Sequence, residues 1–431
     1  MSLSFLFIVL LVLLLFLGIP VAFSTSITPL IIMIIEKGSF NIDTAIIATK
    51  MFSGINKFTI LAIPLFLLAG RLMNVGSMTD KIFKFADVLI GHWKGGMGHT
   101  NILASVIFSG MTGSALSDAA GLGIIELKAM RDAGYDDDFS IAITGASSII
   151  GPIIPPSIAL VIYAVLAGAS VGKVLIAGII PGVVMAVVLM IMVTFYVRKK
   201  NYPTRKKASF FEIWHSFYNS ILELLTPIII IGGMLSGIFT ATEAAAIAVL
   251  YAFIIGAFVY KEINFKNMVE ILYETAKDTA CIMFIMSAAT FYGWLLIRSR
   301  IPIIILEFLT SITQSRLMIL IILNLFLLFI GCFMETIAAL TIVVPIIVPI
   351  LSRFQIDPVH FGVLIVLNLV IGLLTPPFGE VLFVLHKISK VPLERIVKCI
   401  LPFLIPLFIT LILVTVFPPI ATWLPSIVFI K

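Results

Sequence analysis

The chain has 431 residues, of which 61% are hydrophobic and 12% are charged, and its mean hydropathy is +1.21. Soluble domains carry about 25% charged residues, so this composition excludes an ordinary water-soluble protein. Apolar runs of roughly 18 or more residues recur along the whole sequence, and each is long enough to cross a bilayer. The sequence therefore predicts an all-α, polytopic membrane protein.

Several function classes are excluded early. The net charge of +6 is expected from Lys and Arg in cytoplasmic loops, and no basic cluster contains the aromatic residues typical of nucleic-acid binding. There is no HExxH motif and no P-loop, so we expect neither an enzyme nor ATP-driven transport by this chain, and no cofactor. The cysteines Cys281, Cys332 and Cys399 lie in apolar runs and are expected to be buried packing residues.

The chain divides at residues 198–210, which carry six basic residues and no acid and are predicted to form a cytoplasmic loop. The N-terminal apolar run lacks the basic start of a signal peptide and is expected to remain as the first helix. We expect N-terminal scaffold helices over 1–44, a first repeat over 45–173, linking scaffold helices over 174–265, a second repeat over 266–385 and a C-terminal helix over 386–431.

In the first half, helices are expected near 3–23, 25–36 and 56–74, followed by an amphipathic surface helix over 78–90. The apolar stretch 100–130 is interrupted by SGMTGSALSD, and the runs on either side are too short to span a bilayer. A re-entrant helical hairpin fits this pattern, because non-helical backbone at membrane depth must be buried or line a cavity. A helix then rises through the Pro-Pro sequence at 155–156, and a helix over 174–197 returns to the basic loop.

In the second half, helices near 217–238 and 242–260 are expected to form a tight pair, and a long helix over 267–297 follows. Residues 298–314 are predicted to lie on the outer surface. The stretch 317–351 is broken at GCFMET, 360–385 is broken at TPPFG, and a last helix covers 400–416. Glu243 stands three residues after Thr240, a spacing typical of a helix-capping box.

Two segments follow one plan at a separation of 221 residues. At this offset Gly110 matches Gly331, Gly151 matches Gly372 and Pro155 matches Pro376; Ser147 falls on Asn368, so a small polar side chain recurs. Loop charges place the two copies in opposite orientations, which predicts an inverted-repeat transporter with its site between the repeats.

The interrupted segments carry the chemistry. Exposed carbonyls and hydroxyls suit a hard cation such as Na⁺, and prolines free upstream carbonyls. The alternatives are a Gly/Ser packing surface and a ligand-free proline kink. Few ionisable residues should lie at depth: Asp118, Glu243, Asp278, Glu335 and Glu380. Asp118 and Glu335 are the best candidates for a coupling role, whereas Asp278 is expected at the interface beside Lys277.

Several long stretches resemble the large membrane subunit of tripartite ATP-independent periplasmic (TRAP) transporters, the DctM family. They are SGMTGSALSDAAGLG (109–123), AGYDDDFSIAITGASSIIGPIIPPSIALVIYAVLAGASVGK (133–173), FTATEAAAIAVLYAFIIGAFVYKE (239–262), IDPVHFGVLIVLNLVIGLLTPPFG (356–379) and LPFLIPLFITLILVTVFPPIATWLPSI (401–427). The resemblance implies an elevator-type transporter with two re-entrant hairpins in the bacterial inner membrane. It also implies Na⁺-coupled import of organic acids, such as C4-dicarboxylates, sialic acids or other sugar acids. The implied partners are a separate small four-helix membrane subunit and a periplasmic substrate-binding protein.

The resemblance also implies site residues at the hairpin tips and the facing helix breaks. The residues expected to bind Na⁺ are Ser109, Gly110, Thr112, Gly113, Gly151, Pro155, Gly331, Glu335, Thr336, Gly372, Thr375 and Pro376. The residues expected to contact the substrate are Ser114, Asp118, Ser157, Gly379 and Glu380.

The sequence departs from the family pattern at two places. Glu380-Val381-Leu382 follows TPPFG where Leu-Asn-Leu is common, which affects the expected substrate charge, and the first tip has Met111-Thr112 where two serines are frequent. Two alternative functions stay open: a stand-alone Na⁺/carboxylate symporter, and an intramembrane enzyme, for which the sequence offers no residue pair.

Overall fold

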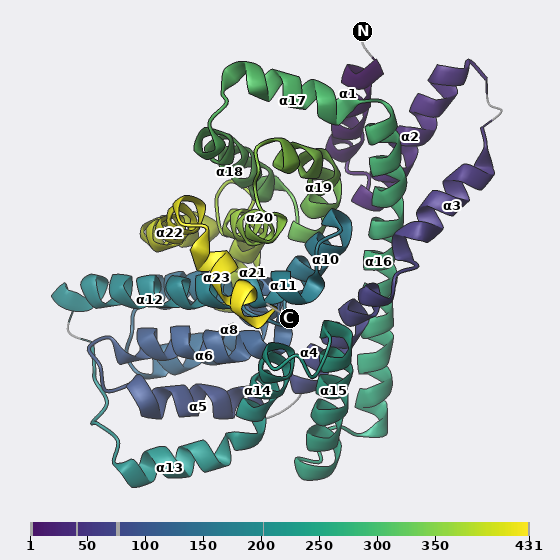
Figure 1. The fold of residues 1–431 in the computed structure, drawn as a ribbon. Coiled ribbons are helices and arrows are strands. Elements are labelled where there is room, and N and C mark those ends of the chain that lie inside the picture. The colour runs from purple at the N-terminus through teal and green to yellow at the C-terminus, as the bar shows by residue number, and fades with distance from the viewer. Residues whose placement is uncertain (1–2, 40–41, 75–77, 201, 430–431) are drawn as a thin grey trace.

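The computed structural model describes residues 3–39, 42–74, 78–200 and 202–429, and every regular element among them is a helix (Figure 1). Six helices in this part of the chain are long and apolar enough to cross a membrane, or eight if each of two bent helix pairs counts as one span. The prediction of an all-α, multi-pass membrane protein is confirmed at this level.

The first half contains twelve α-helices and two short 3₁₀ turns within the described residues. Their bounds are α1 Leu3–Phe16, α2 Val21–Lys37, α3 Thr44–Ile55, η1 Phe58–Leu61, α4 Ala62–Met73, α5 Met78–Ile90, α6 Gly96–Thr112, α7 Ala115–Ala120, α8 Leu122–Asp132, α9 Asp137–Ser148, α10 Ile158–Ala167, α11 Val171–Ala177, α12 Ile179–Tyr196 and η2 Val197–Lys199.

The second half begins after the basic loop and ends in two helices near the C-terminus. Its elements are α13 Phe210–Asn219, α14 Ile221–Leu235, α15 Ala241–Ile254, the π-helical turn η3 Ile255–Val259, α16 Phe265–Arg298, α17 Ile301–Ile312, α18 Arg316–Phe333, α19 Thr336–Arg353, α20 Pro358–Gly372, α21 Glu380–Ser389, α22 Leu393–Val416 and α23 Pro419–Val428.

Most predicted elements are found, and several boundaries differ. The helices α3, α13 and α23 were not predicted from the sequence. Thr240 and Glu243 form the expected capping box at the start of α15. Asp278 does not pair with Lys277, which lies 3.8 Å from Glu274.

The long helix α16 runs along one side of the molecule (Figure 1). Its 34 residues correspond to about 50 Å of α-helix, and it packs along α2, α3, α4 and α19. The helices α5, α6 and α12 run across its direction in a separate stack (Figure 1). Elements of the two repeats contact each other directly, with α10 packed against α19 and α20 and α7 against α21.

The two repeats are recognisable in three dimensions by their helix starts. Asp136 caps α9 by accepting a hydrogen bond from the Phe139 N–H at 2.9 Å. Asp357, which is 221 residues later, caps α20 by accepting from the Val359 N–H at 2.6 Å. The same residue type therefore begins the corresponding helix of each repeat, as an N-cap carboxylate commonly does.

A buried polar contact also recurs in the two repeats. Ser147 on α9 donates to the Asn101 side chain on α6 at 2.6 Å, and Asn368 on α20 donates to the Asn324 side chain on α18 at 2.9 Å. All four side chains are buried, where a polar group is tolerated only when it is hydrogen-bonded. The small polar residues Ser147 and Asn368 thus join α9 to α6 in the first repeat and α20 to α18 in the second.

Candidate functional site

The first interrupted segment connects α6 to α7, and we call residues 112–117 the first tip. Gly113 ends α6 with a left-handed φ of 62°, and Ser114 begins α7 by accepting a hydrogen bond from the Ser117 N–H at 3.4 Å. A Cβ added to Gly113 would lie 2.0 Å from the Pro156 carbonyl oxygen, so only glycine allows the tip to approach the Pro-Pro sequence this closely.

The second interrupted segment connects α18 to α19, and we call residues 334–337 the second tip. Glu335 caps α19 by accepting a hydrogen bond from the Ala338 N–H at 3.0 Å. The hydroxyl of Thr336 at this tip, like that of Thr112 at the first tip, is buried and has no hydrogen-bond partner among the described residues. Each tip therefore carries a buried oxygen that can still accept or donate.

The two Pro-Pro sequences stand opposite the tips. We call residues 149–157 the first break and residues 373–379 the second break, and the Pro-Pro bond in each is cis. At the second break, Thr375 donates its hydroxyl to the Ile371 carbonyl at 2.8 Å. At the first, Ser157 caps α10 by accepting from the Leu160 N–H at 3.2 Å.

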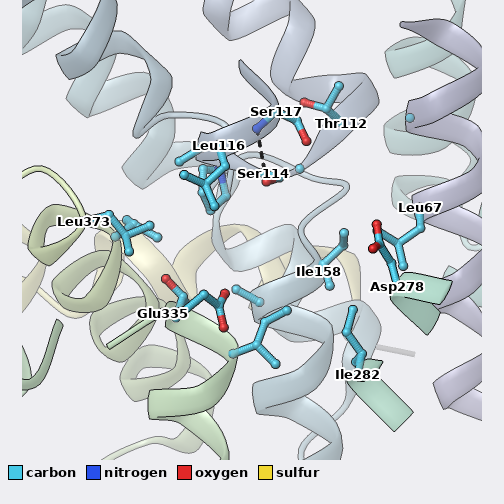
Figure 2. A pocket seen from close by; sticks show the side chains of 18 of the residues that line it. Leu67, Thr112, Ser114, Leu116, Ser117, Ile158, Asp278, Ile282, Glu335 and Leu373 are labelled. Carbon is cyan, nitrogen blue, oxygen red and sulfur yellow. Dashed lines mark hydrogen bonds between the residues drawn. The ribbon is translucent and has the colours of Figure 1, made fainter. Parts of the chain in front are cut away.

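Both tips and both breaks border one cavity of about 490 Å³. Figure 2 shows Ser114 and Glu335 on facing sides of this cavity, with Asp278 on a third side. Besides these segments, residues of α4, α10, α16 and α20 line the wall. The lining residues with polar or ionisable side chains are Arg71, Asn74, Thr112, Ser114, Ser117, Asp278, Cys281, Glu335 and Thr336.

The cavity brings together a minority of the residues predicted from the sequence. Thr112, Gly113, Ser114, Glu335 and Thr336 line it directly. The other predicted residues are not among those that line it, and their roles stay predictions: Ser109, Gly110, Asp118, Gly151, Pro155, Ser157, Gly331, Gly372, Thr375, Pro376, Gly379 and Glu380.

The local surroundings of three residues outside the lining are as follows. A Cβ on Gly110 would lie 2.4 Å from the Pro227 Cβ, so this glycine permits close packing of α6 against α14. Ser109 donates its hydroxyl to the Val106 carbonyl at 2.6 Å. Asp118 is 1% exposed and is buried on α7.

Sequence reasoning missed the wall formed by α4 and α16. Arg71 and Asp278, which form an ion pair, come from these helices, as do Asn74 and Cys281. Arg71 is not among the site residues predicted from the sequence. Cys281 is exposed, contrary to the expectation of a buried packing residue, whereas Cys332 is buried. Two features of the sequence could have indicated this wall: Arg71 directly follows an apolar run, and Asp278 lies inside a long helix.

The fold is shared with solved membrane transporters. The YdaH transporter of Alcanivorax borkumensis superposes with a TM-score of 0.69 at 13% identity, covering 88% of this chain and 90% of that one. Neisseria gonorrhoeae MtrF gives a TM-score of 0.59, also at 13% identity, over 85% of this chain and 82% of that one. At such identities the likeness concerns the fold alone. With the spanning helices, it places the chain among the multi-pass membrane proteins of this fold.

The family is defined by sequence. Residues 8–420 match the DctM component of the tripartite ATP-independent periplasmic transporters, and the chain belongs to that family. It is 46% identical to the sialic acid TRAP transporter large permease protein SiaM of Vibrio cholerae, over 96% of both chains. It is 43% identical to the sialic acid TRAP transporter permease protein SiaT of Haemophilus influenzae, over 95% of this chain and 66% of that protein.

A more distant relative carries a different substrate name. The C4-dicarboxylate TRAP transporter large permease protein DctM of Rhodobacter capsulatus is 34% identical over 97% of both chains. These relatives are named as transporter permeases and not as enzymes. The chain is accordingly a large TRAP permease subunit, and the enzyme alternative is not supported.

Proposed function

We propose that this chain is the large permease subunit of a Na⁺-driven TRAP importer for a sugar acid of the sialic acid type. It would work in the inner membrane with a small four-helix subunit and a periplasmic binding protein. The observation that carries the proposal is the single cavity bordered by both tips and both breaks, which is where inverted-repeat transporters hold substrate and coupling ion. The names of the most similar relatives reported above support a sialic acid over a C4-dicarboxylate.

The charges of the cavity support coupling to a cation. Among the described residues that line it, Asp278 and Glu335 are acids and Arg71 is a base, so the formal charge before any ion binds is negative. An organic anion is disfavoured in such a site until a cation enters. Na⁺ bound near Glu335 would remove this penalty, which gives a physical reason for the ion to bind before the acid.

The donor set at the tips fits Na⁺. The unpartnered hydroxyls of Thr112 and Thr336 are oxygen ligands of the kind that hard cations prefer. The carboxylate of Glu335 adds a negative charge. In the proposed cycle, Na⁺ orders the tips, the acid then binds against them, and the tip-bearing bundle moves across the scaffold built by α1, α2, α14 and α15.

The test is uptake into proteoliposomes that contain this chain and its small subunit. Uptake of sialic acid that needs both an inward Na⁺ gradient and the binding protein is expected. Uptake with Na⁺ but without the binding protein would favour the stand-alone symporter. The absence of Na⁺ dependence would overturn the coupling proposal. Ser114→Ala and Thr375→Ala are expected to weaken Na⁺-dependent uptake without reducing expression.

A further inference from the structure

An ion pair between two different helices forms part of the cavity wall. Arg71 lies in the last turn of α4, and Asp278 lies near the middle of α16. Their side chains are 35% and 41% exposed, so solvent and solutes in the cavity can reach them. Arg71 is the single cationic side chain among the described residues of the lining. An organic anion in this cavity therefore meets one positive charge.

The position of Arg71 is fixed by its neighbour. A Cβ on Gly70 would lie 3.3 Å from both the Met111 carbonyl oxygen and the Thr112 Cα, so the end of α4 packs against the backbone at the end of α6. Arg71 is consequently held beside the first tip, where Ser114 lines the same cavity. The end of α4 also suits a cation, since the C-terminus of a helix carries partial negative charge.

The guanidinium has unused hydrogen-bonding capacity. Arginine has five N–H donors in a planar fork, and in the described part of the chain Arg71 makes one hydrogen bond, from Nη2 to Asp278 Oδ2. A planar fork of this kind matches the two oxygens of a carboxylate. The remaining N–H groups can donate to the carboxylate of a ligand while the contact with Asp278 is kept or exchanged.

We propose that Arg71 recognises the carboxylate of the transported acid, and that Asp278 holds the guanidinium in place when no acid is bound. This inference rests on the proposed function. Asp278 and the substrate compete for the same cation, so Asp278 sets how tightly the acid is held. If the ligand carries two carboxylates, the second has no other cationic side chain to meet in the described lining, which favours a monocarboxylate whose remaining groups contact hydroxyls and amides.

The alternative is that the pair only ties α4 to α16. The two explanations predict opposite effects of Asp278→Asn on the binding of the acid. If the ion pair only holds α4 against α16, removing either charge weakens acid binding to a similar extent. If Arg71 is the carboxylate partner, Arg71→Met weakens binding, whereas Asp278→Asn removes a competitor and strengthens it.

Cys281 provides a readout inside the cavity, since it is exposed there and lies one turn after Asp278. The experiment uses the complex of this chain with its small subunit in detergent and Na⁺, with Cys332 and Cys399 replaced by Ala. The rate of Cys281 alkylation by a maleimide is measured against the concentration of sialic acid or its methyl ester, which lacks the negative charge. Each variant is normalised to its own rate without ligand.

The expected half-protecting concentration of sialic acid rises by about 10- to 100-fold in Arg71→Met, as for loss of a charged hydrogen bond. A smaller rise is expected in Arg71→Lys, which keeps the charge but loses the fork, and a fall is expected in Asp278→Asn. The preference for the acid over its ester should disappear in Arg71→Met. Glu274→Gln, one turn before Asp278 and outside the lining, is the matched control and should equal the parent.

The outcomes separate the two proposals. If sialic acid does not protect Cys281 in the parent protein, the proposed cavity or substrate is wrong. If it does, but Arg71→Met stays within twofold of the parent or Asp278→Asn moves in the same direction, Arg71 is not the carboxylate partner. Should Arg71→Met fail to give a monodisperse complex, Arg71→Lys and Asp278→Asn carry the test.

Discussion

Gly331 and Gly372 pack backbone against backbone, such that a Cβ on Gly372 would lie 2.4 Å from the carbonyl carbon of Gly331. Gly331 is near the end of α18, and Gly372 ends α20 directly before the second break. In the first repeat a different glycine makes the close approach: Gly113 packs against the Pro156 carbonyl. In both repeats a glycine thus brings the region of the tip against the region of the break.

Gly372→Ala is expected to destabilise the protein. The added methyl group would meet backbone atoms of Gly331, which cannot rotate away as a side chain could, and such overpacking costs about 1–3 kcal/mol. Thermal unfolding followed by fluorescence-detected gel filtration measures the effect. Gly232→Ala on α14 is the matched control, because its Cβ would meet no atom within 4 Å. An unchanged transition in Gly372→Ala would mean that the two helices can separate at no cost.

Much of this architecture was accessible from the sequence. The offset of 221 residues relates Asp136 to Asp357 and Ser147 to Asn368, and these positions have corresponding roles as helix caps and buried hydrogen-bonding residues. A repeated pattern is informative because each copy must solve the same packing problem with similar residues. Short polar segments within apolar runs also located both tips.

The remaining wall of the site could not be predicted. Arg71 and Asp278 are 207 residues apart, and they have no partners at the repeat offset that would single them out. Their contact depends on how α4 crosses α16, which is a property of tertiary packing. The helix α13 was missed for a different reason: its capping box of Ser209 and Glu212 follows directly on a basic loop that dominated the interpretation of this region.

Replacement of Glu335 by Gln should weaken the dependence of transport on Na⁺. Glutamine can still accept the hydrogen bond from the Ala338 N–H, so the start of α19 is preserved, whereas the negative charge at the tip is lost. The Na⁺ concentration for half-maximal uptake is expected to rise about tenfold or more, which corresponds to about 1.4 kcal/mol. A Na⁺ dependence identical to that of the parent would exclude Glu335 from the coupling site.

Asn101→Leu should destabilise the first repeat. Asn101 is fully buried, accepts from the Ser147 hydroxyl at 2.6 Å and donates to the Thr144 hydroxyl at 2.8 Å. Leucine has a similar volume but leaves both hydroxyls without this partner. Interhelical hydrogen bonds of membrane proteins contribute about 0.6 kcal/mol each on average, so a loss of about 1–2 kcal/mol is expected in thermal unfolding.

The control for this change is Asn219→Leu, at the exposed end of α13. It should leave the unfolding temperature unchanged. Equal stability of the parent and Asn101→Leu would show that the buried contact between α6 and α9 is energetically neutral.

The basic loop is anchored to the first repeat by Asp136. Its carboxylate accepts hydrogen bonds from the Lys200 ammonium at 2.6 Å and from the Tyr202 hydroxyl. Partial burial alone would raise the pKa of Asp136, but the hydrogen bonds from Lys200, Tyr202 and the Phe139 N–H outweigh this effect and hold its pKa below the usual value of an aspartate. The stabilising effect of the charge is therefore complete above about pH 4 and is lost only as the pH falls through the lowered pKa.

Asp136→Asn should release the loop at neutral pH while largely keeping the helix cap, because asparagine is also a good N-cap residue. A loss of about 1 kcal/mol in anchoring, typical of a partly exposed charge pair, corresponds to roughly fivefold faster trypsin cleavage within residues 198–210. Asp138→Asn, which breaks the contact with Arg395 instead, should leave this rate unchanged.

In the parent, amide exchange of the loop, corrected for its intrinsic pH dependence, should be the same at pH 7 and pH 5. A marked increase at pH 5 would mean that Asp136 is protonated there, contrary to its hydrogen bonding.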